Sequence, residues 1–202
     1  MGRFDDLAKA WDSKPERVAG AMVFVDKVKE HLKCDIKNFK VLDYGCGSGL
    51  VSFGFAGDVS FVEGLDYSFG MIEVYNEKAK QIGMDNIFGN IHDINKEDLS
   101  VNQYDIVVTN MTMHHINNIE DFIFKLAHSL KVGGKLFIAD LYKEDGTFHS
   151  DNTDVVHFGF SEEEIYQAFL KAGLLDITIE KLHSIDKPDK AYDVFIATGA
   201  KE

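Results

Sequence analysis

Apolar and polar positions along the chain follow two periods, one typical of helices and one typical of strands. Residues 15–32 carry apolar side chains at helical spacing, with Pro15 suited to a first helical turn. Short apolar runs bounded by turn residues predict strands. The first half is therefore predicted to contain helices over 15–32, 50–56 and 68–82, the last capped by Ser68, and strands over 39–42, 59–65 and 86–91.

The second half continues this alternation and then breaks it. Strands are predicted over 104–109 and 135–141, with helices over 119–130 and from Ser161 to Gly173, and Val132-Gly133-Gly134 ending the first of these helices. Residues 174–185 and 191–200 are separated by a turn too short for a helical crossover, so they predict an antiparallel hairpin. The fold class is α/β: three αβα layers around a mostly parallel seven-stranded sheet with a C-terminal antiparallel hairpin.

The length of 202 residues and the single run of alternating elements predict one domain. Within it, residues 1–36 are expected to form an N-terminal helical cover and residues 37–202 a Rossmann-like core. The longest irregular segment is 142–160. We expect this segment, together with the N-terminal residues Phe4, Leu7 and Trp11, to close over the binding site and to become ordered when ligands bind.

Charge and cysteine content narrow the range of partners. Asp and Glu number 34 against 21 Lys and Arg, a formal net charge of -13. That balance disfavours nucleic acid and anionic membrane surfaces. Two cysteines are too few for a disulfide framework, and no uncharged apolar run approaches the roughly 18 residues of a membrane span. A cytoplasmic protein without a membrane or nucleic-acid partner is expected, and its oligomeric state stays open.

The segment VLDYGCGSGL places three glycines directly after a predicted strand. A dinucleotide fingerprint that began at Gly45 would need its third glycine at position 50, which is Leu50. The third glycine of this turn is Gly49, so the spacing typical of dehydrogenases is absent. No Gly-Lys-Ser/Thr follows, which excludes a Walker loop. Asp43 beside the turn would repel a pyrophosphate and would suit a ligand that carries a sulfonium or ammonium group.

These residues resemble the class I S-adenosylmethionine-dependent methyltransferases over about residues 39–198. VLDYGCGSGL resembles the first family motif, FVEGLDYSFGMIE the second, NIFGNIHDI the third, YDIVVTNMTMHHI the fourth and SLKVGGKLFIADL a later one. The resemblance implies S-adenosyl-L-methionine as cofactor and S-adenosyl-L-homocysteine as product. It also implies that Asp66 accepts from the ribose hydroxyls and that Asp93 and Ile94 contact the adenine. The cofactor-binding residues expected on this basis are Asp43, Gly45, Cys46, Gly47, Asp66, Tyr67, Met71, Asp93, Ile94 and Asn110.

His114 and His115 follow the fourth predicted strand and are the candidate catalytic bases, because imidazole titrates near neutral pH. The alternative is that they only line the acceptor pocket. Asp140 and Tyr142 end the fifth strand and are expected to face the same cleft. A metal cluster of His149, Asp151, Asp154 and His157 matches no familiar ligand spacing, and no metal is expected. Cys46 is expected to be a small filler without a catalytic role.

The acceptor is less well specified than the cofactor. The loop after the fourth strand reads Asn110-Met111-Thr112-Met113, so its likeness to amino-group methylases of adenine or glutamine ends at Asn110. A small-molecule acceptor, neutral or cationic, fits the net charge best. One alternative is a regulatory or partner protein that binds S-adenosylmethionine without transferring its methyl group. A nucleotide-dependent oxidoreductase rests on fold analogy alone.

Overall fold

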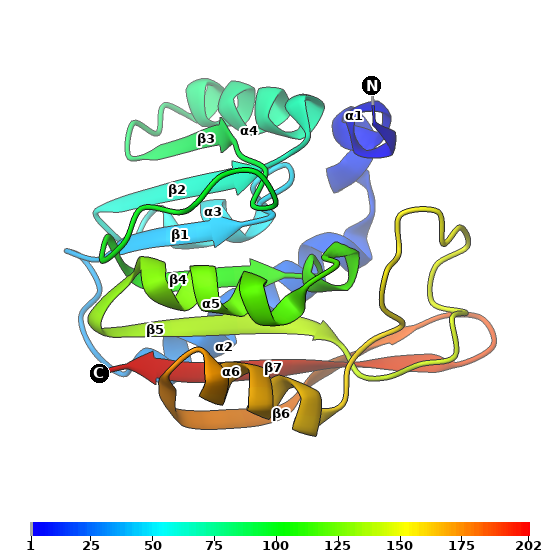
Figure 1. The fold of residues 1–202 in the computed structure, drawn as a ribbon. Coiled ribbons are helices and arrows are strands. Elements are labelled where there is room, and N and C mark those ends of the chain that lie inside the picture. Colours follow the sequence, from blue (N-terminus) through cyan, green and yellow to red (C-terminus); the bar gives the residue numbers. More distant parts are fainter. Residues whose placement is uncertain (1) are drawn as a thin grey trace.

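The computed structural model describes residues 2–202 and contains one seven-stranded sheet in the order β3-β2-β1-β4-β5-β7-β6 (Figure 1). Five neighbouring strands, β3 to β5 in that order, are parallel, and β7 runs antiparallel to both β5 and β6. The strands are β1 (Lys40–Tyr44), β2 (Phe61–Asp66), β3 (Ile87–Ile91), β4 (Tyr104–Asn110), β5 (Leu130–Leu141), β6 (Leu174–Asp186) and β7 (Ala191–Lys201). The predicted fold class is confirmed.

Helices cover both faces of the sheet, because the central strands are apolar on both sides. On β1, Val41 packs into one core cluster and Leu42 into the other. The first cluster joins the sheet to α2 (Pro15–Leu32), α3 (Leu50–Phe55) and α4 (Phe69–Ile82), and the second joins it to α5 (Ile119–Ser129) and α6 (Glu162–Lys171). Strands buried on both faces read as continuous apolar runs, which is the pattern seen in the sequence.

Two helix starts have the capping chemistry that the sequence predicts. The Ser68 hydroxyl accepts from the backbone N–H of Met71 at 3.3 Å at the start of α4. Ser161 and Glu164 form a reciprocal capping box at the start of α6. Such caps satisfy N–H groups that have no partner inside the helix, and each is worth about 1 kcal/mol.

The structure differs from the sequence prediction at several boundaries. Strand β5 begins at Leu130, five residues before the predicted start at 135, because Leu130 already pairs with Tyr104. The ladder is then irregular across Gly133, whose φ is +82°, and regular pairing resumes at Lys135. Three short elements were not predicted: α1 (Arg3–Leu7), the 3-10 helix η1 (Ala8–Ser13) and the 3-10 helix η2 (Met113–His115).

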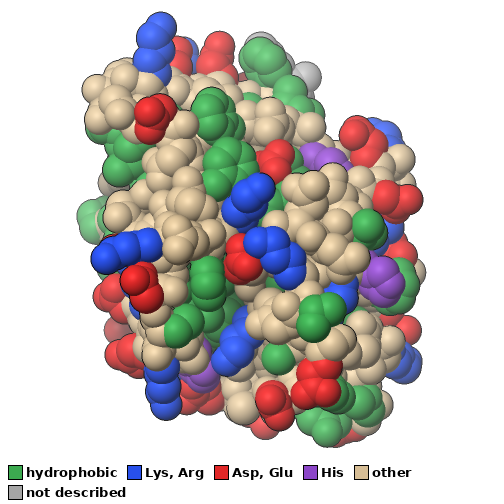
Figure 2. Space-filling model, turned by 90° about the vertical axis from the view of Figure 1, so that its left-hand side faces the viewer, with side chains coloured by type: hydrophobic (Ala, Val, Ile, Leu, Met, Phe, Trp, Pro, Cys, Tyr) green, Lys and Arg blue, Asp and Glu red, His purple; other side chains and the backbone are tan. Residues whose placement is uncertain are grey.

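All five parallel strands point their carboxyl ends toward the same side of the molecule, to the right in Figure 1. The opposite side, where these strands begin, shows acidic and basic side chains intermingled with separate apolar ones (Figure 2). The winding of the sheet reverses between β1 and β4, and open α/β sheets bind their ligands beyond the strand ends at such a point. Among the helices of residues 2–202, none combines the length and the apolar character that crossing a membrane requires.

Candidate active site

A cavity of about 980 Å³ lies beyond the carboxyl ends of the parallel strands. Its volume is at the upper end of the range that small-molecule sites occupy, about 300–1,000 Å³. The structure brings all twelve candidate site residues from the sequence to the wall of this one cavity. They are Asp43, Gly45, Cys46, Gly47, Asp66, Tyr67, Met71, Asp93, Ile94, Asn110, His114 and His115.

The glycines of the turn after β1 serve different purposes. A Cβ at Gly45 would stand 2.3 Å from the Thr112 side chain, so this glycine is required by the contact with the loop after β4. A Cβ at Gly47 would meet nothing closer than the Met71 sulfur at 3.8 Å and the Trp11 Nε1 at 3.9 Å, both on the cavity wall. Gly47 has a φ of +52° and leaves its backbone open to a ligand in the cavity.

Asp66 ends β2 and holds the glycine turn in place. Its carboxylate accepts from the backbone N–H of Gly47 at 2.9 Å and from that of Ser68 at 2.8 Å. Burial raises the pKa of Asp66, and these two hydrogen bonds oppose the rise. The side chain also lies on the cavity wall, where its lone pairs can receive further donors.

Asp43 departs from the simple picture of an acid that faces the ligand. Its Oδ2 accepts from the backbone N–H of Ser52 at 3.0 Å and from the Ser52 hydroxyl at 2.7 Å, so its first partner is the helix α3. Only 1% of the residue is exposed, and this burial raises the pKa of Asp43 to about 7. The carboxyl group therefore changes charge near neutral pH at the edge of the cavity.

The wall beyond β3 is built from Asp93 and Ile94. The Asp93 carboxylate pairs with Lys96 at 2.7 Å, and this contact lowers the pKa of Asp93. The backbone N–H of Ile94 donates to the hydroxyl of buried Tyr44 at 2.9 Å, which ties the β3 turn to the end of β1. Cys46 is also buried and lines the cavity. Burial raises the pKa of its thiol well above the usual range, so the group is a poor nucleophile.

His114 and Asp140 form a buried pair at the inner end of the cavity. The His114 Nδ1 lies 2.8 Å from Asp140 Oδ1, and the backbone N–H of His114 donates to Oδ2 at 3.2 Å. Burial raises the pKa of Asp140, but the charge and the hydrogen bonds of His114 outweigh it and lower the pKa overall. An ionised carboxylate can only accept, so Nδ1 carries a proton, and in the neutral form of the ring Nε2 is the acceptor. Asp140, expected to face the cleft, is instead fully buried behind His114 and is not on the cavity wall.

Two further histidines surround the pair. The ring of His115 lies 4.1 Å from that of His114, centroid to centroid, and its Nδ1 is 2.6 Å from the Asp154 carbonyl. The ring of His149 lies 5.0 Å from His114. Burial, followed by the neighbouring His114, lowers the pKa of His115 and of His149 to about 4. Both rings are therefore neutral at pH 7.

The N-terminal segment lies across α4 beside the cavity. The Asp5 carboxylate accepts from the Ser68 hydroxyl at 2.6 Å and from the Gly70 N–H at 2.9 Å, and these bonds lower the pKa of Asp5 to about 2. Asp12 forms an ion pair with Lys78 at 2.6 Å. These contacts bring Phe4, Leu7 and Trp11 to the cavity wall, where the sequence places a cover.

The structure corrects one expectation about the 142–160 segment and adds contacts that the sequence did not predict. Tyr142 does not face the cleft: its hydroxyl donates to Glu162 at 3.0 Å and its ring packs on Phe195. Among residues 2–202 no group of three or more His, Cys, Asp or Glu side chains is placed to hold a metal ion. His157 instead lies 2.9 Å from the Ile116 carbonyl. The sequence around His149 does not predict that its ring lies beside His114, because a tertiary contact brings the two together.

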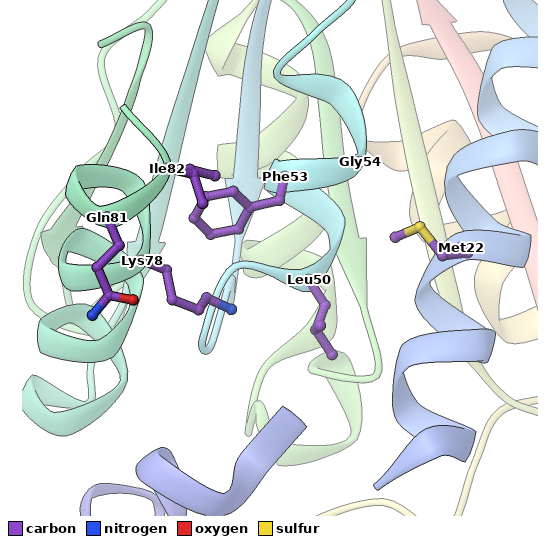
Figure 3. A pocket seen from close by; sticks show the side chains of 7 residues that line it. All are labelled: Met22, Leu50, Phe53, Gly54, Lys78, Gln81 and Ile82. Atoms are coloured by element: carbon purple, nitrogen blue, oxygen red, sulfur yellow. The ribbon is translucent and has the colours of Figure 1, made fainter. Parts of the chain in front are cut away.

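A second hollow, of about 350 Å³, lies between α2, α3 and α4 on the outside of the sheet (Figure 3). It is mostly apolar, and its one charged group, Lys78, is already paired with Asp12. The hollow offers no pair of groups for acid or base chemistry. Its lining residues are Met22, Leu50, Phe53, Gly54, Lys78, Gln81 and Ile82.

Comparisons with known proteins agree with this geometry. Residues 35–173 match the model of a family described as a methyltransferase domain. Over 149 residues the chain is 32% identical to an uncharacterized methyltransferase of Schizosaccharomyces pombe, a match that covers 66% of this chain and 52% of the relative. Over 143 residues it is 28% identical to a ubiquinone biosynthesis O-methyltransferase of Coxiella burnetii, covering 70% of this chain and 61% of the relative.

A solved structure of similar fold is the Haemonchus contortus phosphoethanolamine N-methyltransferase 2 in complex with S-adenosyl-L-methionine. It superposes with a TM-score of 0.75 at 15% identity, over 100% of this chain and 60% of that chain. An identity this low supports the fold alone. The chain spans only about half to three fifths of the length of the two curated relatives.

Proposed function

This chain belongs to the class I S-adenosylmethionine-dependent methyltransferase family, and we propose that it transfers a methyl group from S-adenosylmethionine to a small-molecule acceptor. The observation that carries the proposal is the cavity itself. The turns after β1 and β2 supply an open glycine backbone and a buried carboxylate on one side of it, and His114 with Asp140 lies on another. When bound, the cofactor supplies a methyl group on a positively charged sulfur.

The residues present fit this cofactor. The Asp66 carboxylate keeps lone pairs for the ribose hydroxyls after its two backbone contacts. Gly47 leaves its backbone open to the cavity, with Met71 and Trp11 as the nearest side chains. The ionised form of Asp43 favours a cationic ligand at the same turn. These groups would hold the cofactor from the strand ends, with Asp93 and Ile94 beside the adenine and Tyr67, Asn110 and Cys46 completing the wall.

His114 is the group that we propose as the general base. An acceptor that loses a proton on methylation needs a nearby base, and the Nε2 of His114 is the acceptor nitrogen on the cavity side of the Asp140 contact. Asp140 acts as a positioning residue, since it fixes the ring and its tautomer. His115 is a poor alternative, because a pKa of about 4 makes it a weak base and its Nδ1 is engaged by the Asp154 carbonyl.

The cover supports the transfer by excluding water and holding the acceptor. The rings of Phe4 and His115 pack in a T-shaped arrangement with centroids 5.3 Å apart, so the N-terminal segment contacts the loop after β4. The backbone N–H groups of Val156 and His157 both donate to the His114 carbonyl, so the 142–160 segment closes the other side. Orientation of two reactants inside such an enclosure accounts for much of the acceleration expected of a methyl transfer.

Isothermal titration of the chain with S-adenosylmethionine tests the cofactor part of the proposal. We expect binding, and we expect Asp66→Asn to weaken it by about tenfold to a hundredfold, because hydrogen bonds to a charged group are worth about 1.5–3 kcal/mol. Glu77→Gln removes one acid from the exposed face of α4 and serves as the control, which should bind as the parent does. No heat from the parent protein would contradict the proposal.

The transfer part is tested by S-adenosylhomocysteine release over a panel of small acceptors. Release with at least one acceptor, lost in His114→Gln, is the expected result. Tight cofactor binding without release over the whole panel would instead support a regulatory or partner protein that only binds S-adenosylmethionine.

A further inference from the structure

The acceptor side of the cavity has a charge opposite to that of the whole chain. Four basic side chains lie on its wall, Arg3, Lys14, Arg17 and Lys187, against the exposed carboxylates of Glu16 and Asp154. The whole chain carries -13. A net charge describes long-range attraction, whereas recognition of a ligand group depends on the charges that face it inside the site. The charge of the group that the acceptor presents is therefore better inferred from these local cations than from the net charge.

Two of these cations are held for other purposes. Arg3 pairs with Asp151 at 3.6 Å. The Arg17 guanidinium stacks 3.6 Å above the centre of the Trp11 ring and donates to the Trp11 carbonyl at 3.3 Å. Both contacts shape the cover. Lys14 and Lys187 are not paired with any carboxylate of residues 2–202, and Lys187 uses only one of its three donors on the Phe148 carbonyl, so both ammonium groups keep donors for a ligand.

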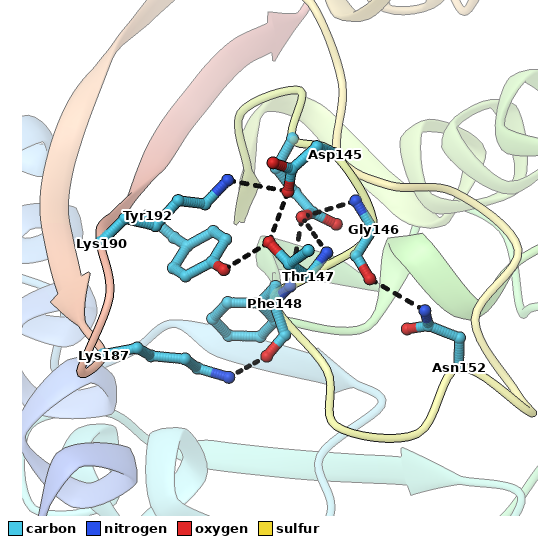
Figure 4. Close-up of polar contacts among 9 residues, drawn as sticks. Asp145, Gly146, Thr147, Phe148, Asn152, Lys187, Lys190 and Tyr192 are labelled. Atoms are coloured by element: carbon cyan, nitrogen blue, oxygen red, sulfur yellow. Dashed lines mark hydrogen bonds and ion pairs between the residues drawn. The ribbon is translucent and has the colours of Figure 1, made fainter.

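Lys187 lies in the β6–β7 turn and reaches over the 142–160 segment (Figure 4). Its ammonium donates to the Phe148 carbonyl and lies 4.1 Å from the centre of the Phe148 ring. Burial and the like charge of nearby Lys14 lower the pKa of Lys187, and only Glu144 opposes them. Within residues 2–202, neither lysine has a carboxylate oxygen within ion-pair distance. Glu144 is near enough to affect Lys187 but pairs with neither ammonium, so the two cations can attract an anionic group of a ligand.

His149 adds an independent observation. Its Nε2 is buried and has no hydrogen-bond partner among residues 2–202. Its ring lies between that of His114, at 5.0 Å, and that of Phe148, at 4.7 Å. A buried polar nitrogen without a partner is unfavourable, so a ligand group that reached it would stabilise the site. Lys187 is close enough to contribute to lowering the pKa of His149, so this ring lies near both that lysine and His114.

We propose that the acceptor is a small molecule with an apolar or aromatic body and one oxyanion group, held by Lys187 and Lys14 while its reacting atom lies at His114. The aromatic side chains of Phe4, Trp11 and Phe148 on the cavity wall receive the body. The proposal rests on the proposed function, and it departs from the neutral or cationic acceptor that the net charge favours. Carboxylate and phosphate share the required chemistry.

The test uses small probes of one shape and different charge on the full chain saturated with S-adenosylhomocysteine. Benzoate, phenyl phosphate, benzamide and benzylammonium are titrated, and binding is followed by chemical-shift changes of the histidine and backbone resonances. We expect at least one of the two anions to bind at least tenfold more tightly than benzamide or benzylammonium. The stronger of the two anions identifies carboxylate or phosphate as the group recognised.

Variants assign the preference to the lysines. Lys14→Gln and Lys187→Gln should each reduce the anion preference by at least threefold, whereas Lys80→Gln on α4 is the matched control and should leave it unchanged. Lys187→Gln also removes the contact with Phe148, but Lys14 makes no such contact, so loss in Lys14→Gln cannot be ascribed to the loop.

Equal binding of the neutral probe, or an anion preference that survives both lysine variants, would overturn the proposal. Failure of S-adenosylhomocysteine to bind in the first place would contradict the proposed function instead, so the two failures are distinguishable.

Discussion

The cavity has two halves that differ in origin and in charge. The half at β1, β2 and β3 is built from turns that directly follow those strands, and its charge comes from the carboxyl groups of Asp43, Asp66 and Asp93. The half at β4 and β5 is assembled from the N-terminal segment, the loop after β4, the 142–160 segment and the β6–β7 turn. Its ionisable groups are mostly histidines and lysines. Each half is complementary to a ligand of the opposite charge.

The two halves also differ in how they are held. In the first half, backbone donors of neighbouring turns fix each acid, as Gly47 and Ser68 fix Asp66. In the second, contacts between distant segments fix the groups, as the β6–β7 turn fixes the 142–160 segment: Lys190 pairs with Asp145 at 2.7 Å, and the Tyr192 and Thr147 hydroxyls lie 2.7 Å apart (Figure 4). The geometry of the first half follows from the strand ends of the fold. The geometry of the second half depends on contacts between loops and terminal segments.

The largest effect is expected at His114, in the second half. His114→Gln should lower kcat with the best acceptor of the panel by about 10²–10⁴-fold, the usual contribution of a general base, and leave the affinity for S-adenosylmethionine unchanged. His115→Gln is the matched control and should lose less than about tenfold, because a ring with a pKa of about 4 is a weak base. Equal losses in the two variants would refute the assignment of the base.

Weakening the contacts that hold the 142–160 segment should affect binding of the acceptor and not binding of the cofactor. Lys190→Gln combined with Tyr192→Phe removes two contacts to this segment, an exposed ion pair and a hydrogen bond between hydroxyls. We expect the KM of the acceptor to rise by about tenfold while the Kd of S-adenosylmethionine stays constant. Steady-state kinetics and calorimetry measure the two values. A parallel loss of cofactor affinity would show that the halves are not independent.

A smaller effect is expected on the pH dependence of S-adenosylmethionine binding in the first half. The folded chain holds the pKa of Asp43 at about 7 through burial, with Asp66 as a nearby like charge and Ser52 as the opposing donor. A bound cation favours the ionised carboxylate and lowers that pKa, so affinity for S-adenosylmethionine should rise roughly three- to tenfold from about pH 6 to about pH 8. Asp43→Asn should flatten the profile. The profile of S-adenosylhomocysteine, which lacks the sulfonium charge, should be shallower.

The smallest effect is on stability in acid. Burial, His114, His115, Lys187 and Arg3 lower the pKa of His149 to about 4, below the ordinary value of 6.5. A lowered folded-state pKa contributes stability that is present above pH 6.5 and is lost as the pH falls toward about 4. His149→Gln should therefore lose less stability over that window, a difference of about 2–4 °C in Tm. Identical slopes for variant and parent would contradict the placement of His149.

The sequence is informative about the two halves to different degrees. The strand order, the antiparallel hairpin and the position of the glycine turn follow from periodicity and spacing, because these are local patterns. The residues beyond β1, β2 and β3 lie within a few positions of a strand end, so a linear motif locates them. The sequence did not reveal that Asp43 bonds to Ser52, since a side chain's choice of partner depends on the packed helix.

Local sequence patterns predict little of the second half. His114 and Asp140 are 26 positions apart, and both were candidates only as strand-end residues. Lys187 and His149 meet the cavity because a hairpin turn packs on an irregular segment, and no period in the sequence records that contact. Net charge was a poor guide there, since four cations gather on one wall of an acidic chain. Tertiary structure was required to see both features.

The division of the cavity is tested most directly by a crystal structure of the chain with S-adenosylhomocysteine. The account predicts that electron density fills the acidic half, with the ribose against Asp66 and the nucleoside beside Asp93 and Ile94, and that the space between His114 and Lys187 receives no part of it. Density in the basic half, or in the apolar hollow between α2 and α4, would contradict the account.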